Sequence, residues 1–413
     1  MPEKNLISLD EARARLLAAV RPLARTEMID WVITDEFADG RVLTQDLISP
    51  LRVPPHDCAA MDGYALRAAD VAASGGTLPV TQRIAAGQTA MPLAPGSAAR
   101  IFTGAPLPSG ADAVVMQEDA QSLDDGARVQ FAARPKTGQH VRPAGEDVAR
   151  GAVIMRRGER LGPAGIGLAA SVGLARAEVA ARPRVALLCT GDELVMPGRD
   201  LPPGHIYDSN RFVLRALLTR LGCQVDDLGA IADRLDETVA ALDQAAQTHD
   251  LIVTSGGVSV GEEDHVKPAV RQLGRLDLWQ IAIKPGKPFA FGQLPRKDGG
   301  NCYFAGLPGN PVSGFITFLL LVRPLLLQLQ GAARLDTPAL PLRADFDWPK
   351  PGKRREFLRA RRNADGGLEL YPNQGSAALT ALHWADGLVD LPAGQTVARG
   401  DTVRYLPLAE LLA

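Results

Sequence analysis

A regular alternation of apolar runs and helical segments begins near Arg182 and most constrains the fold of this chain. Strands that alternate with helices in this way form a mostly parallel sheet, so the sequence predicts a doubly wound α/β domain. Its predicted strands are residues 185–188, 224–229, 251–254, 278–283, 289–292 and 302–305. A long apolar helix should run from Pro311 to about Gln330. Pro324 should kink or split that helix, because proline lacks the amide proton.

Acidic residues follow three of these predicted strands. Glu193 lies in the segment TGDEL after the first strand, Asp233 lies just beyond the second, and Asp264 ends the segment TSGGVSVGEED after the third. The carboxyl ends of parallel strands meet at one edge of a sheet, where open α/β sheets bind ligands. No side chain stands out as a covalent nucleophile. Three carboxylates at this edge therefore predict a metal-assisted site for an anionic substrate.

The segment TSGGVSVGEED also has the composition of an anion-binding loop. Gly256 and Gly257 allow backbone amides to approach a ligand closely, and Ser255 and Ser259 add hydroxyl donors. It is not a Walker A loop, because no Gly-Lys-Ser/Thr follows. A tight strand-to-helix turn with an acidic N-cap explains the same residues without a ligand. We favour the ligand role, because residues this small and polar fill a core poorly.

Two further loops follow later strands of the same predicted sheet. IKPGKP holds Lys284 and Lys287 at a fixed separation, which suits a phosphate or another oxyanion between two ammonium groups. A solvated basic turn is the alternative for this loop. LPGNPVSG opens a helix with Asn310 as N-cap and Pro311 in the first turn. Pro308 in that segment belongs either to a structural turn or to the wall of a ligand site.

The chain changes character on both sides of the predicted α/β domain. Residues 49–147 and the chain after Gly331 consist of short apolar runs between prolines and glycines, which predicts a β-rich module and a small C-terminal barrel or sandwich. Asp62 of MDGYA, Thr103 of FTGAPLPSGADAVV and Ser376 of QGSAAL are small polar residues beside glycines. Taken alone, each of the three is typical of a turn or a strand end.

Composition narrows the functional classes and the partners. A net charge of −2, with no long run of one sign, argues against a nucleic-acid partner. The four cysteines form no CxxC pair and the first residues lack the apolar stretch of a signal peptide, so we expect a cytoplasmic location. The richest apolar stretch, residues 315–322, is far shorter than the roughly 20 residues that span a bilayer, so we expect no membrane partner.

Nine short segments are distributed along nearly the whole chain, in this order: MDGYA, FTGAPLPSGADAVV, RPAGED, TGDEL, TSGGVSVGEED, IKPGKP, LPGNPVSG, RREFLR and QGSAAL. Together they resemble the MoeA family of molybdopterin molybdenumtransferases, which is related to the C-terminal domain of gephyrin. The resemblance implies an enzyme of molybdenum cofactor biosynthesis. Such an enzyme takes adenylylated molybdopterin and molybdate, inserts molybdenum and releases AMP, usually with Mg²⁺ as cofactor.

The resemblance also implies a domain organisation and an assembly. The expected units are an elongated helical domain from residues 1–48 and 148–181, an inserted β-rich domain from 49–147, an α/β molybdopterin-binding domain from 182–331 and a C-terminal β-barrel from 332–413. The implied assembly is a homodimer whose cleft combines the α/β domain of one chain with the inserted domain of the other. Transient contact with the molybdopterin adenylyltransferase is a further expectation.

Matching the family motifs position by position implies functional residues. The implied catalytic residues are Asp62, Thr103, Glu193, Asp264 and Lys284. The implied metal ligands are Asp233, Asp264 and Glu193. The implied substrate contacts are Thr190, Ser255, Gly256, Gly257, Ser259, Lys287, Pro308, Arg355 and Ser376. Among these, Lys284 and Arg355 are the candidates to contact an oxyanion.

The chain departs from the family pattern at four positions. Cys58 and Ala59 stand where Asn and Ser are common, Gln280 stands where a lysine is common, and Ala377 stands where a glycine usually follows the serine. These departures concern expected substrate contacts and leave the acidic set intact.

Three alternative functions stay open at this point. A non-catalytic scaffold of the gephyrin type predicts lost acidic residues or a long linker with an appended domain, and the sequence contains neither. A molybdopterin adenylyltransferase is typically a single small α/β domain, so the flanking modules favour the insertion step. A magnesium-dependent nucleotide pyrophosphatase would use the same acids and lysines.

Overall fold

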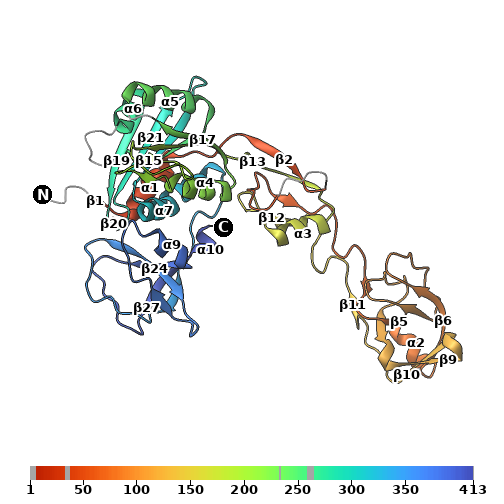
Figure 1. Cartoon of the computed structure of the whole chain (residues 1–413). Coiled ribbons are helices and arrows are strands. Elements are labelled where there is room, and N and C mark those ends of the chain that lie inside the picture. The colour runs from red at the N-terminus through yellow and green to blue at the C-terminus, as the bar shows by residue number, and fades with distance from the viewer. Residues whose placement is uncertain (1–5, 33–37, 232–233, 258–264, 413) are drawn as a thin grey trace.

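The computed structural model describes residues 6–32, 38–231, 234–257 and 265–412, and Figure 1 shows an elongated molecule. The α/β domain and the C-terminal unit lie together at one end. An arm leads away from them, and a β-rich module lies at the far end of that arm (Figure 1). The predicted multidomain fold with mixed α and β content is therefore confirmed.

A seven-stranded sheet forms the centre of the α/β domain, in the order β1-β19-β21-β22-β18-β14-β17. Its strands are β1 (Leu6–Ile7), β14 (Arg184–Thr190), β17 (Gln224–Ile231), β18 (Leu251–Ser255), β19 (Arg275–Ile281), β21 (Pro288–Pro295) and β22 (Asn301–Leu307). Neighbours pair in parallel except β21, which is antiparallel to both of its neighbours. Every strand predicted for this domain is present, and the three that precede the acidic segments are adjacent and parallel.

Helices cover both faces of this sheet, as alternating side chains along β14 require. Val185 and Leu187 face a core shared with α1 (Leu9–Ala19) and α4 (Asn210–Arg220). Ala186 and Leu188 face a second core. The helices against that second core are α5 (Leu235–Thr248) and α6 (Val266–Leu273).

Helix α1 corrects one expectation about the N-terminal segment. Its start follows the capping pattern in the sequence, because the Ser8 hydroxyl accepts a hydrogen bond from the Glu11 amide at 3.0 Å. We expected residues 1–48 to join the elongated helical domain. Instead Leu9 and Leu16 are buried in the core of the α/β domain, so the first helix belongs to that domain.

The long apolar helix is interrupted where proline was expected to disturb it. It consists of α7 (Pro311–Thr317), a π-helical turn (Phe318–Val322) and α8 (Arg323–Leu329), with Pro324 in the first turn of α8. The missing amide proton of proline explains why the α-helical bonding pattern changes there. Among the described residues, Pro311–Leu329 is long and apolar enough to cross a membrane, but 83% of its apolar window is buried inside the protein. It is the core helix of the α/β domain.

The arm consists mainly of paired strands. β2 (Thr26–Asp30) pairs with β13 (Arg176–Ala180), and β3 (Leu47–Ile48) pairs with β12 (Val153–Met155). Helix α3 (Pro163–Ser171) packs beside them and begins with a proline, whose fixed φ angle suits the first turn of a helix. The helical character expected for residues 1–48 and 148–181 thus describes only part of this unit.

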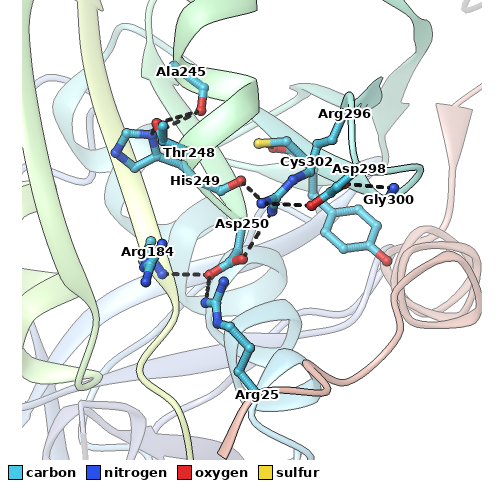
Figure 2. Close-up of polar contacts among 11 residues, drawn as sticks. Arg25, Arg184, Ala245, Thr248, His249, Asp250, Arg296, Asp298, Gly300 and Cys302 are labelled. Carbon is cyan, nitrogen blue, oxygen red and sulfur yellow. Dashed lines mark hydrogen bonds and ion pairs between the residues drawn. The ribbon is translucent and has the colours of Figure 1, made fainter.

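A buried carboxylate ties the arm to the α/β domain (Figure 2). The side chain of Asp250, which precedes β18, is only 2% exposed. Its Oδ2 atom accepts hydrogen bonds from Arg25 Nη2 at 2.6 Å and from the Arg184 amide at 2.8 Å. The Arg296 guanidinium lies 3.5 Å from the other oxygen. Because Arg25 directly precedes β2, this ion pair fixes the point where the arm leaves the domain.

The β-rich module contains a six-stranded sheet in the order β8-β5-β7-β6-β10-β9. Its strands are β5 (Gly63–Leu66), β6 (Thr77–Ile84), β7 (Ala98–Ile101), β8 (Ala113–Met116), β9 (Ala120–Leu123) and β10 (Arg128–Phe131), with helix α2 (Ala68–Ala73) beside them. Buried side chains form a separate core on each side of the sheet. Strands β4 (Cys58–Ala59) and β11 (Val141–Arg142) pair where the module joins the arm.

The C-terminal unit is a second six-stranded sheet that docks directly on the α/β domain. Its strands are β20 (Ile283–Lys284), β23 (Leu340–Arg343), β24 (Arg355–Arg362), β25 (Leu368–Leu370), β26 (Gly387–Leu391) and β27 (Thr402–Pro407). An isolated bridge between Ala344 and Leu368 links the two ends of the β23-β27-β26-β24-β25 series. β20 comes from the α/β domain and pairs in parallel with β24, so the junction between the units lies at the predicted lysine loop.

Candidate active site

The carboxyl ends of β14, β18 and β22 lie side by side at one edge of the α/β sheet. β18 is the middle strand, and its last residue, Ser255, lies opposite Cys189 of β14 and Leu307 of β22. Thr190 and Pro308 directly follow those two partners, so three of the predicted substrate contacts come together here. Asp233, Ser259 and Asp264, which were also predicted for this edge, lie outside the described residues.

The first turn of the glycine-rich loop fits closely against the neighbouring strand ends. The Gly256 amide donates to the Leu307 carbonyl at 3.1 Å, and Gly256 and Gly257 have φ angles of +87° and +67°. A Cβ atom on Gly257 would lie 2.6 Å from a methyl carbon of Val266 and 3.1 Å from Thr190 Oγ1. Glycine is therefore required here for backbone conformation and packing. A role of these glycines in binding a ligand stays a prediction.

Asn210, the first residue of α4, joins two of the loops at this edge. Its Nδ2 atom donates to Ser255 Oγ at 2.8 Å and to the Gly309 carbonyl at 2.7 Å. The Ser255 hydroxyl therefore accepts from Asn210 and keeps its own proton available to donate. Sequence reasoning missed Asn210, because an asparagine at the start of a helix is ordinarily explained as a cap.

Glu193 lies at the same edge in the segment after β14. Its backbone carbonyl accepts from the Ile206 amide at 2.9 Å, where β15 (Leu194–Val195) pairs with β16 (Ile206–Tyr207). Its carboxylate lies over Gly191, where an added Cβ atom would be 2.5 Å from Oε2. The side chain is exposed, and no hydrogen bond or ion pair joins the carboxylate to another described residue. Glu193 is therefore available to a ligand or an ion.

Lys284 extends from the junction between the α/β domain and the C-terminal unit. Its Nζ atom lies 3.2 Å from Oε1 of Glu356, and the lysine side chain is 51% exposed whereas the glutamate is 4% exposed. Three protons on Nζ leave two free to donate outward. The ammonium group is thus held by the buried Glu356 carboxylate and remains exposed to solvent on its other side. Glu356 belongs to the RREFLR segment, and its role depends on a tertiary contact that the sequence alone did not indicate.

Arg355, the neighbour of Glu356, is engaged by protein groups. Its Nε and Nη2 atoms bond the two carboxylate oxygens of Asp390 at 2.6 and 2.7 Å, and these hydrogen bonds raise the pKa of the guanidinium. Arg404 also donates to Asp390 at 3.1 Å. The structure therefore gives Arg355 a role in holding β24 and β26 together, and its expected contact with an oxyanion stays a prediction.

The QGSAAL segment of the C-terminal unit contacts the start of α7. The Ser376 carbonyl accepts from the Val312 amide at 3.0 Å, which places this loop beside the segment that contains Pro308. Arg359 supports the loop from beneath, because its Nη2 atom donates to the Gly375 carbonyl at 3.4 Å. Arg359 is 1% exposed, and burial lowers its pKa to about 10. The C-terminal unit thus contributes two features to this edge, namely Glu356, which holds Lys284, and the QGSAAL loop.

Asp62 and Thr103 form a compact pair in the β-rich module. Both the amide and the hydroxyl of Thr103 donate to Asp62 Oδ1, at 2.8 and 2.7 Å. These hydrogen bonds lower the pKa of the Asp62 carboxyl, so that it stays ionised. Asp62 directly precedes β5, and Figure 1 shows β5 at the far end of the arm from the α/β domain. Within one chain, the fold does not bring this pair to the other predicted site residues.

The described residues alone do not make up a metal site. Among them, no three His, Cys, Asp or Glu side chains are placed to hold an ion. Glu193 is the one predicted ligand that the structure describes, and the other two lie beyond the described ranges. The described residues instead place hydroxyl, amide and ammonium donors around one sheet edge, which suits an anionic ligand.

Comparisons with known proteins agree with this architecture. Family profiles match residues 7–173 as "MoeA N-terminal region (domain I and II)", residues 186–328 as "Probable molybdopterin binding domain" and residues 341–408 as "MoeA C-terminal region (domain IV)". A molybdopterin molybdenumtransferase of Haemophilus influenzae is 40% identical over 98% of this chain and 100% of its own length. A molybdopterin molybdenumtransferase 2 of Mycobacterium tuberculosis is 37% identical over 86% of this chain and 89% of its own length.

A solved structure shares the whole arrangement. The crystal structure of the molybdopterin biosynthesis moeA protein from Pyrococcus horikoshii OT3 superposes with a TM-score of 0.83 at 26% identity, and covers 97% of this chain and 100% of the other. Family profiles that cover most of the chain, and full-length relatives above 30% identity, together settle the assignment. The chain belongs to the MoeA family of molybdopterin molybdenumtransferases, and it is a transferase of molybdenum cofactor biosynthesis.

Proposed function

We propose that this enzyme inserts molybdenum from molybdate into adenylylated molybdopterin and releases AMP. The observation that best supports this reaction is the convergence of donors at the carboxyl edge of the α/β sheet. Ser255, positioned by Asn210, ends β18 of that sheet. The open ammonium group of Lys284 comes from β20, which follows β19 of the same sheet and pairs with β24 of the C-terminal unit. A substrate with a pyrophosphate and an oxyanion co-substrate both require such donors.

Each described group has a distinct part in this proposal. Lys284 and Lys287 supply positive charge for the phosphate oxygens or for molybdate, and no hydrogen bond or ion pair joins the Lys287 ammonium to another described residue. Ser255 and Thr190 supply hydroxyl groups at the strand ends. The buried carboxylate of Glu356 holds Lys284 in place, which lowers the entropy lost when substrate binds.

We further propose that a second copy of the chain completes the site. Asp62 and Thr103 match the family motifs but lie in the module at the far end of the arm (Figure 1). A symmetric dimer in which the arm of each chain reaches the α/β domain of the other would bring this pair to Lys284. The ionised Asp62 carboxylate is then a group that can accept a proton or orient water.

Other expectations remain proposals of the same kind. Magnesium would be held by Glu193 together with Asp233 and Asp264, and it would stabilise charge on the pyrophosphate. We also propose a cytoplasmic location, a closed barrel for the C-terminal unit and transient contact with the adenylyltransferase that makes the substrate.

Purified enzyme and adenylylated molybdopterin, incubated with and without molybdate, test the reaction. Chromatography measures AMP, and mass spectrometry measures molybdenum bound to the pterin. The proposal predicts AMP release that depends on molybdate and equals the molybdenum inserted. AMP release of the same size without molybdate would indicate a pyrophosphatase and contradict the proposal. Consumption of ATP with unmodified molybdopterin would indicate an adenylyltransferase.

A further inference from the structure

Two arginines share one aromatic ring in the β-rich module. Arg83 of β6 lies opposite Arg100 of β7 in the sheet register. Their guanidinium carbons lie 4.4 and 4.5 Å from the ring centroid of Phe102. Cation–π contacts of this kind hold a guanidinium in a fixed orientation while its N–H groups remain free for other partners. The module therefore carries two like charges beside one another.

The two arginines differ in how they are bonded. Arg100 donates from Nη1 to the Gly63 carbonyl at 2.8 Å and from Nη2 to Gln117 Oε1 at 2.5 Å, so its guanidinium is engaged by the protein. Arg83 is exposed. Among the described residues, its guanidinium contacts the Phe102 ring and forms no hydrogen bond or ion pair. Arg83 is thus oriented but keeps its hydrogen-bonding capacity.

This pair of arginines adjoins the Asp62–Thr103 pair. Thr103 directly follows Phe102, and the charge of Arg100 helps to lower the pKa of Asp62. Among the described residues, neither arginine forms an ion pair with the Asp62 carboxylate. The two hydrogen bonds that this carboxylate accepts both come from Thr103. A positive charge without a protein counter-ion therefore lies next to a residue pair that the family motifs mark as functional. A guanidinium presented in this way suits a phosphate or another tetrahedral oxyanion.

We infer that Arg83, supported by Phe102 and Arg100, is a substrate-binding residue of the β-rich module that contacts a tetrahedral oxyanion. This inference rests on the proposed function for the identity of the ligand. The oxyanion is either a phosphate of the adenylylated pterin or molybdate, and the two sources share the geometry that a guanidinium recognises. The module then contributes binding energy as well as the Asp62 carboxylate to a site completed by the partner copy.

Calorimetric titration of the intact protein with inorganic pyrophosphate, and separately with molybdate, tests this inference without any turnover. The variants are Arg83→Ala and, as a matched control, Arg128→Ala. Arg128 is an exposed arginine of the same module that lies 3.7 Å from Asp124. Loss of one charge-assisted contact should weaken binding of one of the two anions about tenfold in Arg83→Ala. Arg128→Ala should bind both anions as the parent does.

Arg83→Lys separates charge from geometry. It keeps the positive charge but loses the planar fork and the stacking on Phe102, so it should recover only part of the lost affinity. The anion whose affinity falls identifies the source, either a pyrophosphate group or molybdate. Unchanged affinity for both anions in Arg83→Ala, or an equal loss in Arg128→Ala, overturns the inference. A parent enzyme that binds these anions but shows no molybdate-dependent AMP release contradicts the proposed function instead.

Discussion

Replacement of Asp250 by asparagine should destabilise the α/β domain by an amount that the structure allows us to work out. The carboxylate is 2% exposed and bonds Arg25 at 2.6 Å and the Arg184 amide at 2.8 Å. Breaking a buried ion pair costs about 3–5 kcal/mol. Asparagine keeps one acceptor oxygen, and Arg25 is 37% exposed and gains water, so we expect about 2–3 kcal/mol for this change.

Differential scanning calorimetry measures this loss as a lower melting temperature. For a domain of this size, 1 kcal/mol shifts Tm by roughly 2–4 °C, so Asp250→Asn should lower Tm by about 5–10 °C. Asp226→Asn is the control, because its carboxylate is 72% exposed although it lies 2.9 Å from His249. An exposed pair contributes about 0–1 kcal/mol, so this control should melt within about 4 °C of the parent. A shift of equal size in the two variants, or none in Asp250→Asn, refutes the reasoning.

Four further substitutions test the site. Thr103→Val removes the hydroxyl donor to Asp62, so the pKa of that carboxyl should rise toward the ordinary range. Its negative charge should then be lost at a higher pH than in the parent, and an unchanged titration by ¹³C NMR contradicts this. Asn210→Ala removes two hydrogen bonds and should cost about 1–3 kcal/mol in urea unfolding and slow AMP release; parent-like values in both assays contradict it. Lys284→Ala should lower kcat for AMP release about 100-fold, and Glu356→Gln should lower it less than tenfold, because Glu356 acts only by holding Lys284. A larger loss in Glu356→Gln than in Lys284→Ala, measured by steady-state kinetics, contradicts this role of Glu356.

Local patterns predicted the elements of the α/β domain well. The strands 185–188 and 251–254 were predicted because buried strands of parallel sheets are continuous apolar runs, and the residues of both strands are buried. The strand 224–229 lies at the edge of the sheet, and none of its residues is buried. The cap at Ser8 and the first-turn proline of α3 follow from the bonding needs of helix ends, which are local too. These features depend on residues within one or two turns of each other.

Features that depend on distant contacts were missed or misplaced. The docking of α1 on the α/β sheet depends on which surface its apolar stripe meets, and the amphipathic pattern does not specify that surface. Lys284 and Glu356 are 72 residues apart, and they meet only because β20 pairs with β24. Asn210 likewise acts on Ser255 across two loops. Sequence patterns identify the polar residue types, but the fold decides which of them meet.

The proposal that two chains share each site can be tested by mixing two defective variants. In Asp62→Asn the module is defective, and in Lys284→Ala the α/β domain is defective. A mixed dimer should contain one site with both residues intact, because each chain supplies the group that the other lacks. With random association, half of the dimers are mixed, so co-expressed variants should recover about a quarter of parental molybdate-dependent AMP release.

Each variant alone serves as the baseline, and parental enzyme diluted to the same concentration serves as the reference. The account predicts that the co-expressed mixture regains activity far above the sum of the two separate variants. If each site were built within one chain, every chain in the mixture would carry a defect. Activity that stays at the sum of the separate variants, in a preparation shown by mass spectrometry to contain mixed dimers, would contradict the shared site.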